Sequence, residues 1–366
     1  MARKQFLSFL LIFSLLFSCA SALAEADDDD DWDDNVDDAW EMEHSLRSGD
    51  YAYALLDDGT VEITSYGGDD AEIVIPDTLD GKPVTAIGER AFYYNLSLTS
   101  VTIPDSVTRI SQKAFSCCFQ LTSITLPSGL TAIESGTFDL CKSLTTIDIP
   151  DSVAAIADDA FIGCKALQSF TLSPNHPYFF LADGALCRTA DSTLLFYPNA
   201  REPRTYRIPD GIAAISAYAF YDCDLLESVV IPNSITRIPE RAFYGCSALA
   251  SVSLPDSLTE IGIAAFSFCA ALTDIRIPAA ITEISNHMFS GCTSLATLEI
   301  PDSVTKIGDY AFWGCTSLTS IALPNSVTII GNGAFSYCDA LTLTVTPDSY
   351  AAKYAQANGI SYTCVD

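Results

Sequence analysis

Cysteine has the widest chemical scope of any residue type in this chain, because a thiol can bind zinc, form a disulfide or act as a nucleophile. The 366 residues include thirteen cysteines, and paired CxxC motifs, the usual spacing of zinc ligands, are absent. Nine of the cysteines share one spacing, each lying three residues after a phenylalanine: Cys118, Cys141, Cys164, Cys223, Cys246, Cys269, Cys292, Cys315 and Cys338. A thiol repeated at one phase points one way, into a core, where it acts as a small hydrophobic group.

The same spacing disfavours disulfides. Neighbouring thiols of such a column would face in one direction rather than towards each other, which is poor geometry for a bridge. We therefore expect buried, unbridged thiols in the column. Exposure or pairing is expected only of the cysteines off the column, Cys117, Cys187 and Cys364.

Other catalytic or ligand-binding patterns are missing. The three histidines, His44, His176 and His287, share no phase and have no partner motif. The chain contains no glycine-rich phosphate loop and no nucleophile elbow. The aspartate-rich segment 25–50 matches no calcium loop, since it lacks the glycine that such a loop needs at its turn. The sequence therefore predicts no catalytic residue, no cofactor and no metal site, and favours a protein that is not an enzyme.

The cysteine spacing belongs to a unit of 23 residues. The phenylalanines fall in two series with this spacing, which are separated by a jump of 59 residues: Phe92, Phe115, Phe138 and Phe161, then Phe220, Phe243, Phe266, Phe289, Phe312 and Phe335. A leucine lies six residues after each of them. Self-similarity at a period of 20–29 residues is typical of a leucine-rich-repeat solenoid. The pattern therefore predicts about ten stacked repeats.

One unit shows how each repeat should fold. In the segment 121–126, Ser123-Ile-Thr-Leu126 alternates as a half-buried strand should, and Pro127 ends the strand because it has no N–H to donate. Pro-Asp-Ser or Pro-Asn-Ser then forms a turn in most units. Stacking would give a parallel concave sheet with short helical or 3-10 backs. In the last unit, Thr344 and Thr346 are expected at inward positions, as if the array closed there.

The chain divides by composition into a few segments. Residues 1–24 are typical of a signal peptide cleaved after Ala24, and lipid anchoring at Cys19 is the alternative. The remaining predicted segments, in order, are an acidic disordered spacer at 25–50, a β N-terminal cap at 51–76, leucine-rich repeats at 77–346 with a hairpin elaboration at 173–208, and a helix-strand C-terminal cap at 347–366.

Charge narrows the range of partners. The formal net charge is −29, and binding to nucleic acid or anionic lipid needs clustered Lys and Arg. No apolar run reaches the length of a membrane span. The sequence therefore predicts an extracellular protein or glycan partner, no nucleic acid and no membrane span.

The predicted concave sheet is the best candidate for a binding surface. Its outward positions lie two and four residues before each proline, and most are Ser or Thr, which β-propensity and solubility explain well. The candidate partner-binding residues are the charged exceptions and two aromatic residues of the hairpin elaboration: Asp148, Arg207, Asp274, Arg276, Glu299, Tyr178 and Phe179.

The repeat also has a family resemblance. The pattern L-x-x-I-x-I-P-D-S-V-T-x-I-G-x-x-A-F-x-x-C, as it stands in the segment Leu295 to Cys315, resembles the BspA-like (Treponema-type) leucine-rich repeat family. Asp58 to Thr64 and Asp80 to Val84 are similar to the usual N-terminal portion of that family. The resemblance implies a secreted or surface protein of a bacterium or protist that adheres to host matrix, host cells or other microbes. A passive surface spacer without a specific ligand is the alternative.

Overall fold

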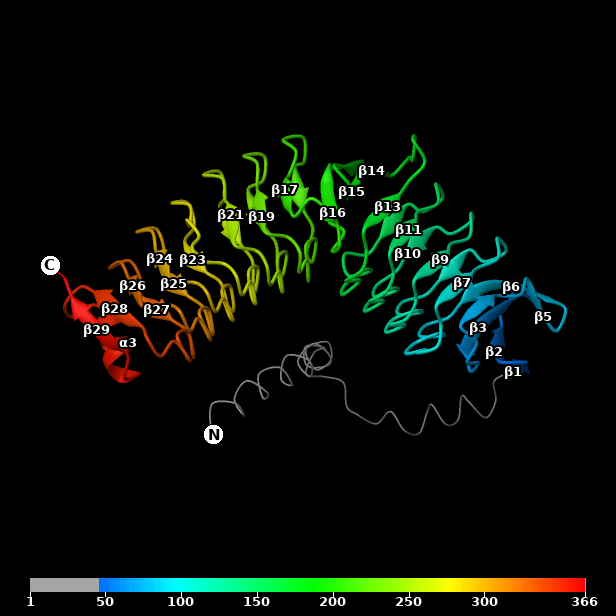
Figure 1. Cartoon of the computed structure of the whole chain (residues 1–366), viewed down its shortest axis with the longest axis horizontal. Coiled ribbons are helices and arrows are strands. Elements are labelled where there is room, and N and C mark those ends of the chain that lie inside the picture. The colour runs from blue at the N-terminus through cyan, green and yellow to red at the C-terminus, as the bar shows by residue number, and fades with distance from the viewer. Residues whose placement is uncertain (1–45, 366) are drawn as a thin grey trace. The chain divides into compact units, whose positions relative to one another are not determined.

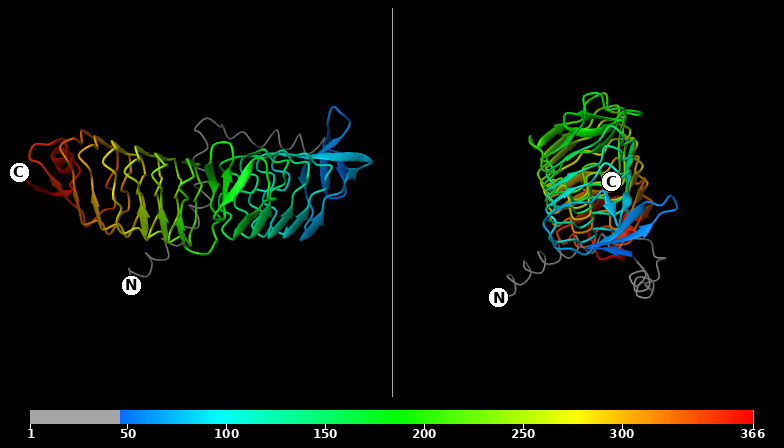
Figure 2. Two further views of the ribbon diagram at one scale, coloured as in Figure 1. Left: turned by 90° about the horizontal axis from the view of Figure 1, so that it is seen from above. Right: turned by 90° about the vertical axis from the view of Figure 1, so that its right-hand side faces the viewer.

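The computed structural model describes residues 46–365, so the predicted signal peptide, Cys19, His44 and most of the predicted acidic spacer lie outside the described residues. From Arg47 onwards the chain forms one compact unit. Within this unit, successive turns of the chain stack side by side in one curved row (Figure 1) and overlie one another when viewed from one end (Figure 2).

One side of the stack carries a row of short parallel strands in four separate hydrogen-bonded sheets, which we call the long ladder. Its strands are β4 (Glu72–Val74), β7 (Ser100–Thr102), β9 (Ser123–Thr125), β11 (Thr146–Asp148), β13 (Ser169–Thr171), β17 (Thr205–Arg207), β19 (Ser228–Val230), β21 (Ser251–Ser253), β24 (Thr297–Glu299), β26 (Ser320–Ala322), β28 (Thr342–Val345) and β29 (Ser361–Cys364). Partners lie in register one repeat apart, as in Ser228↔Ser251. Most of these strands bury only their middle residue, as the sequence predicted.

A second ladder, of two-residue strands, runs along another side of the same turns, and we call it the short ladder. Its regular strands are β8 (Arg109–Ile110), β10 (Ala132–Ile133), β12 (Ala155–Ile156), β18 (Ala214–Ile215), β20 (Arg237–Ile238), β22 (Glu260–Ile261), β23 (Glu283–Ile284), β25 (Lys306–Ile307) and β27 (Ile329–Ile330). In each of these strands the second residue is buried and the first faces outwards.

The N-terminal cap closes one end of the stack. It is formed by β1 (Leu46–Ser48), β2 (Tyr51–Leu55), β3 (Val61–Tyr66), β5 (Thr78–Leu79) and β6 (Lys82–Ile87). These strands pair in the order β1-β2-β3-β6-β5. In addition, β6 pairs with β8, the first regular strand of the short ladder. β1 lies inside the segment that was predicted as a spacer, and β4 is the first strand of the long ladder rather than a strand of the cap sheet.

The backs of the repeats are hydrogen-bonded turns rather than helices. Two residues in most turns have a left-handed backbone, two positions before and two after the column phenylalanine, as in Arg241 (φ 53°) and Gly245 (φ 74°) around Phe243. Such residues end a right-handed helix, so the expected short helices do not form in the described backs. Backbone bonds join each turn to the next instead: Phe243 N–H, for example, donates to the Ala265 carbonyl at 2.9 Å.

The phenylalanine column forms the centre of the core. Phe266 is fully buried, and its ring stacks between Phe243 at 5.3 Å and Phe289 at 6.0 Å, with planes within 10° of parallel. Burying a side chain of this size contributes roughly 1.5–3 kcal/mol before ordering costs are subtracted. Because each ring covers the next, no turn can bury its apolar side alone.

The column thiols have a second structural role. Cys269 donates to the Phe243 carbonyl oxygen at 3.2 Å, and Cys118 donates to Phe92 in the same way at 3.0 Å. Burial raises the pKa of Cys118 to about 12, so the donor proton stays in place. In the first turn Asn95 takes the place of the thiol and donates to the Gly68 carbonyl.

Of the three cysteines off the column, two are buried and one is exposed, as expected. Cys187 is fully buried, and Cys117 is 8% exposed. Cys364, on β29, is exposed. Cys187 lies in the hairpin, on a strand whose first three residues are buried, so its position off the column did not lead to exposure.

The hairpin elaboration is smaller than the predicted segment 173–208. It consists of β14 (Phe179–Ala182), β15 (Ala185–Arg188) and β16 (Thr193–Phe196), which pair antiparallel in that order. β16 then joins the short ladder by pairing with β18. The regular repeat resumes at Tyr197, which stacks on Phe220 at 5.3 Å and accepts the Cys223 thiol bond on its carbonyl.

The C-terminal cap contains the helix α3 (Tyr350–Ala357) followed by β29. Ser349 caps α3 by accepting the Ala352 N–H, and Asn358 is its C-cap, in agreement with the predicted helix. The expectation for the last unit was wrong, because Leu343 and Val345 are the buried residues of β28. Ser320 pairs with Thr342, so this unit is one residue shorter and its inward positions are displaced by one.

Candidate partner-binding surface

The long ladder exposes two columns of side chains, one from the first and one from the third residue of each strand. Arg207 is the third residue of β17, and Val230 and Ser253 have the same place in β19 and β21. Arg276 has this repeat position in the following turn, where residues 274–276 form no strand. If this turn follows β21 at the 4.7–4.9 Å spacing of paired strands, three turns separate the two arginine backbones by about 14 Å.

Both arginines are exposed and form an ion pair with a turn carboxylate. Arg276 Nη1 lies 2.7 Å from Asp256 Oδ1, and Arg207 Nη2 lies 3.5 Å from Asp210 Oδ1. The arginine side chains are 71% and 66% exposed, and the aspartates 80% and 81%. Such pairs contribute about 0–1 kcal/mol, because water competes for both partners.

A groove of about 480 Å³ lies between the arginines. Its lining combines these charged residues with apolar surface from Val230 and Leu254 and from the prolines that end two strands. The remaining lining residues are Ile231, Asn233, Ser234 and Ser253.

The other charged candidates lie outside this groove. Asp148 accepts a hydrogen bond from Thr171 at 2.6 Å, in a separate sheet of β11 and β13. Asp274, on the same turn as Arg276, and Glu299, on the next turn, are exposed, but neither lines the groove. The structure therefore brings Arg207 and Arg276 together and leaves Asp148 apart.

The two aromatic candidates separate completely. Tyr178 is 44% exposed, whereas Phe179 is 2% exposed and packs in the core. Phe179 begins β14 with its ring turned inwards, so we remove it from the partner-binding residues.

His176 fixes the start of the hairpin. Its Nδ1 accepts the backbone N–H groups of Tyr178 and Phe179 at 3.3 and 3.2 Å. Its Nε2 therefore carries the proton and donates to the Pro150 carbonyl at 3.0 Å. The histidine positions Tyr178 and is not arranged for catalysis.

The sequence did not identify Val230, Leu254, Asp210 or Asp256 as parts of a site. Val230 carried a signal, because it replaces a hydroxyl in the third-residue column. The two aspartates carried none, since they occur in the same Pro-Asp turn as in other repeats.

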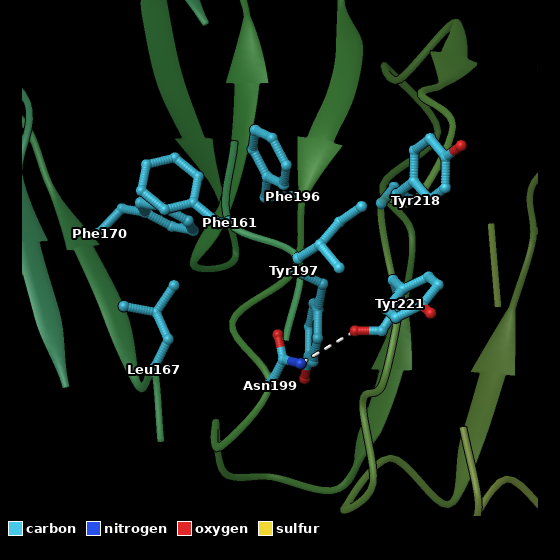
Figure 3. Close-up of a pocket in the computed structure, with 10 residues that line it drawn as sticks. Phe161, Leu167, Phe170, Phe196, Tyr197, Asn199, Tyr218 and Tyr221 are labelled. Atoms are coloured by element: carbon cyan, nitrogen blue, oxygen red, sulfur yellow. Dashed lines mark hydrogen bonds between the residues drawn. The ribbon is translucent and has the colours of Figure 1, made fainter. Parts of the chain in front are cut away.

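A small cavity lies where the hairpin meets the resumed repeat (Figure 3). Its volume is about 10 Å³, and it is lined by aromatic residues that include Phe161, Phe196 and Tyr221. Asn199 Nδ2 donates to the Tyr221 carbonyl beside it at 2.9 Å. The space is that of a single water at most, so we interpret it as a packing seam.

Partly buried carboxylates occur on the turns rather than in the groove. Burial raises the pKa of Asp139 to about 6, although Ser116 donates to its carboxylate at 3.4 Å.

The third histidine, His287, packs against an aromatic residue: its ring stacks on that of Tyr310 with ring centroids 5.1 Å apart. Among residues 46–365, no three His, Cys, Asp or Glu side chains form a group that could hold a metal ion.

The match to a known family is extensive. The model of the BspA type leucine-rich repeat region matches residues 81–181 and 213–342. This chain belongs to the BspA-type leucine-rich repeat family. The unmatched stretch between the two ranges holds most of the hairpin and the turn of Tyr197, which are the places where the structure departs from the repeat.

Solved structures give the same result. A leucine rich cell surface protein of Faecalibacterium prausnitzii is 32% identical with a TM-score of 0.51, and the match covers 87% of this chain and 97% of that one. A leucine-rich repeat protein of Eubacterium ventriosum, 24% identical, has a TM-score of 0.61 over 79% of this chain and 93% of that one, which supports the fold alone. No curated protein matches the chain.

The BspA-type repeats of this protein form a scaffold in which the hairpin of β14, β15 and β16 lies between β13 and β17 of the long ladder. In the described part of the chain, no helix has the length and hydrophobicity that a membrane span requires.

Proposed function

We propose that this protein acts outside the cell as a binding or adhesion protein whose long ladder engages a protein or glycan partner. Its membership of the BspA-type family and its similarity to a cell surface protein support an extracellular role. The observation that carries the proposal is the groove of about 480 Å³ between Arg207 and Arg276, since these two arginines depart from the repeat.

The surrounding surface supports the same interpretation. The two arginines add little to folding, because they are exposed and form ion pairs with exposed aspartates. Arginine is also enriched among the residues that dominate binding at protein interfaces. The cleavage of residues 1–24 and the alternative of a lipid anchor at Cys19 remain part of the proposal and are tested by the N-terminal sequence and mass of the secreted protein.

Binding of the purified protein to immobilised matrix proteins, glycans and bacterial surfaces tests this function. We expect saturable binding that an Arg207→Ala/Arg276→Ala/Glu299→Ala variant loses. The matched control is Arg237→Ala/Lys306→Ala/Glu283→Ala, which removes two cations and one anion from the short ladder instead. Equal loss in both variants would contradict a site on the long ladder. No binding by a folded protein would favour the passive spacer.

A further inference from the structure

Three of four consecutive turns of the long ladder depart from the hydroxyl pattern of its third-residue column, and only Ser253 keeps it. At this position Arg207, Val230, Ser253 and Arg276 follow one another. In the other turns of the described chain the position carries no cation, and Thr is the commonest residue, as at Thr102 and Thr125 in β7 and β9. β-propensity explains a threonine here but explains neither arginine.

The two aspartates of the groove have a structural explanation that the arginines lack. Asp210 and Asp256 follow the proline that ends each strand, as Asp105 and Asp151 do far from the groove. Asp105 accepts the Ser128 N–H at 2.8 Å, and Asp151 accepts the Ser173 hydroxyl at 2.6 Å. A carboxylate at this position therefore also occurs, bonded to the neighbouring turn, at two places far from the groove, whereas a cation in the third-residue column occurs only beside the groove in the described turns.

Each guanidinium retains most of its hydrogen-bonding capacity. Arg276 uses one of its five N–H donors on Asp256, and Arg207 approaches Asp210 at only 3.5 Å. Because both aspartates are exposed, an incoming carboxylate can displace them at little cost and bind the planar guanidinium through two hydrogen bonds.

The apolar part of the groove lies between these two donors. Val230 and Leu254 are partly exposed, and Pro232 and Pro255 flank them. No lining residue is aromatic, so the groove lacks the flat ring surface on which a sugar would stack. An extended peptide rises about 3.3–3.4 Å per residue, so side chains four residues apart span about 13 Å. This span matches the separation of the arginine backbones.

We propose that the groove binds an extended acidic segment of a partner protein, with two carboxylates about four residues apart on Arg207 and Arg276 and an apolar side chain on Val230 and Leu254. The inference rests on the proposed function, because it names the partner chemistry of the same surface.

The test uses the full protein and a fluorescent synthetic peptide with two glutamates four residues apart and a valine midway between them. We expect saturable binding by anisotropy, and about tenfold or greater weakening for Arg207→Ala and for Arg276→Ala, since each loses a charge-assisted hydrogen bond. Asp256→Asn should tighten binding several-fold, because it removes the competing carboxylate. The Arg237→Ala/Lys306→Ala control should leave the affinity unchanged.

Three outcomes would overturn the inference. Tighter binding of a peptide with lysines in place of the glutamates, weakened by Asp256→Asn, would indicate a cationic partner. Equal competition by polygalacturonate would indicate an acidic glycan. The third outcome is that the peptide does not bind, while binding to the panel of matrix proteins, glycans and bacterial surfaces is still lost in the Arg207→Ala/Arg276→Ala/Glu299→Ala variant. This result would reject the acidic peptide and leave the proposed function standing.

Discussion

The long ladder and the short ladder are built from the same turns, yet their charged residues are paired differently. On the short ladder, opposite charges of nearby strands pair with each other: Arg237 with Glu260 at 2.8 Å, and Lys306 with Glu283 at 2.6 Å. On the long ladder, Arg207 and Arg276 pair only with turn carboxylates, and apolar or small residues separate them. The short ladder thus balances its own charges, whereas the long ladder retains donors for a ligand.

The largest expected effect concerns the core that both ladders share. Phe266→Ala should destabilise the protein by about 3–5 kcal/mol, because it leaves a cavity between two stacked rings. Hydrogen exchange should increase in the flanking strands of both ladders, β21 and β22. If amide protection were lost in one ladder alone, the two ladders would not share the phenylalanine column as a common core. Ile329→Ala, at an exposed site of the short ladder, is the control.

The next effect concerns the hairpin that interrupts the long ladder. His176→Ala should cost about 1–3 kcal/mol, since the backbone N–H groups of Tyr178 and Phe179 lose their acceptor. Their amide exchange should accelerate, while the pairing of β16 with β18 in the short ladder stays protected. His287→Ala is the matched control. Uniform loss of protection across the array would contradict this local role.

A smaller effect concerns pH and the turns outside both ladders. The pKa of Asp139 is raised to about 6 from 3.8, so the folded state keeps a proton that the unfolded state loses at lower pH. Stability should therefore fall as the pH rises from about 4 to 6 and level off above. Asp139→Asn should remove about 1–2 kcal/mol of this fall. Denaturant titrations at several pH values test this, with exposed Asp302→Asn as control, and an unchanged slope would contradict it.

The smallest effect directly tests the comparison of the ladders. A double-mutant cycle on Arg237 and Glu260 should give a coupling of about 0.2–1 kcal/mol, whereas the cycle on Arg207 and Asp210 should give a value near zero. Denaturant unfolding measures both cycles. A stronger coupling for Arg207 and Asp210 would mean that this arginine is held by the fold rather than retained for a ligand.

Much of the fold could be predicted from the sequence because the repeat imposes it. The spacing of phenylalanine, cysteine and leucine predicted the stacked turns, and the helix α3 was predicted by the helical propensity of residues 349–359 and their Asn358-Gly359 end. The resumption of the repeat at Tyr197 was missed, because tyrosine replaces phenylalanine and alanine replaces the column cysteine there. The inward residues of β28 were missed because that unit is one residue shorter.

The candidate site was predicted only in part. Arg207 and Arg276 were identified because a charge stands out in a column of hydroxyls, while Phe179 was included only because it is aromatic in a segment that breaks the repeat. An aromatic side chain in an irregular segment can face either way, and packing against the core turned this one inwards.

The sequence by itself determined the periodicity, the buried columns and the exposed face, because a side chain repeated at one phase must point in one direction in every turn. The tertiary structure decided which exposed residues form a groove. That choice depends on the carboxylates of the turns and on Leu254, whose positions beside the arginines arise only when four turns stack. It also decided that the backs are turns, since the left-handed residues that exclude a helix are fixed by hydrogen bonds to the next turn.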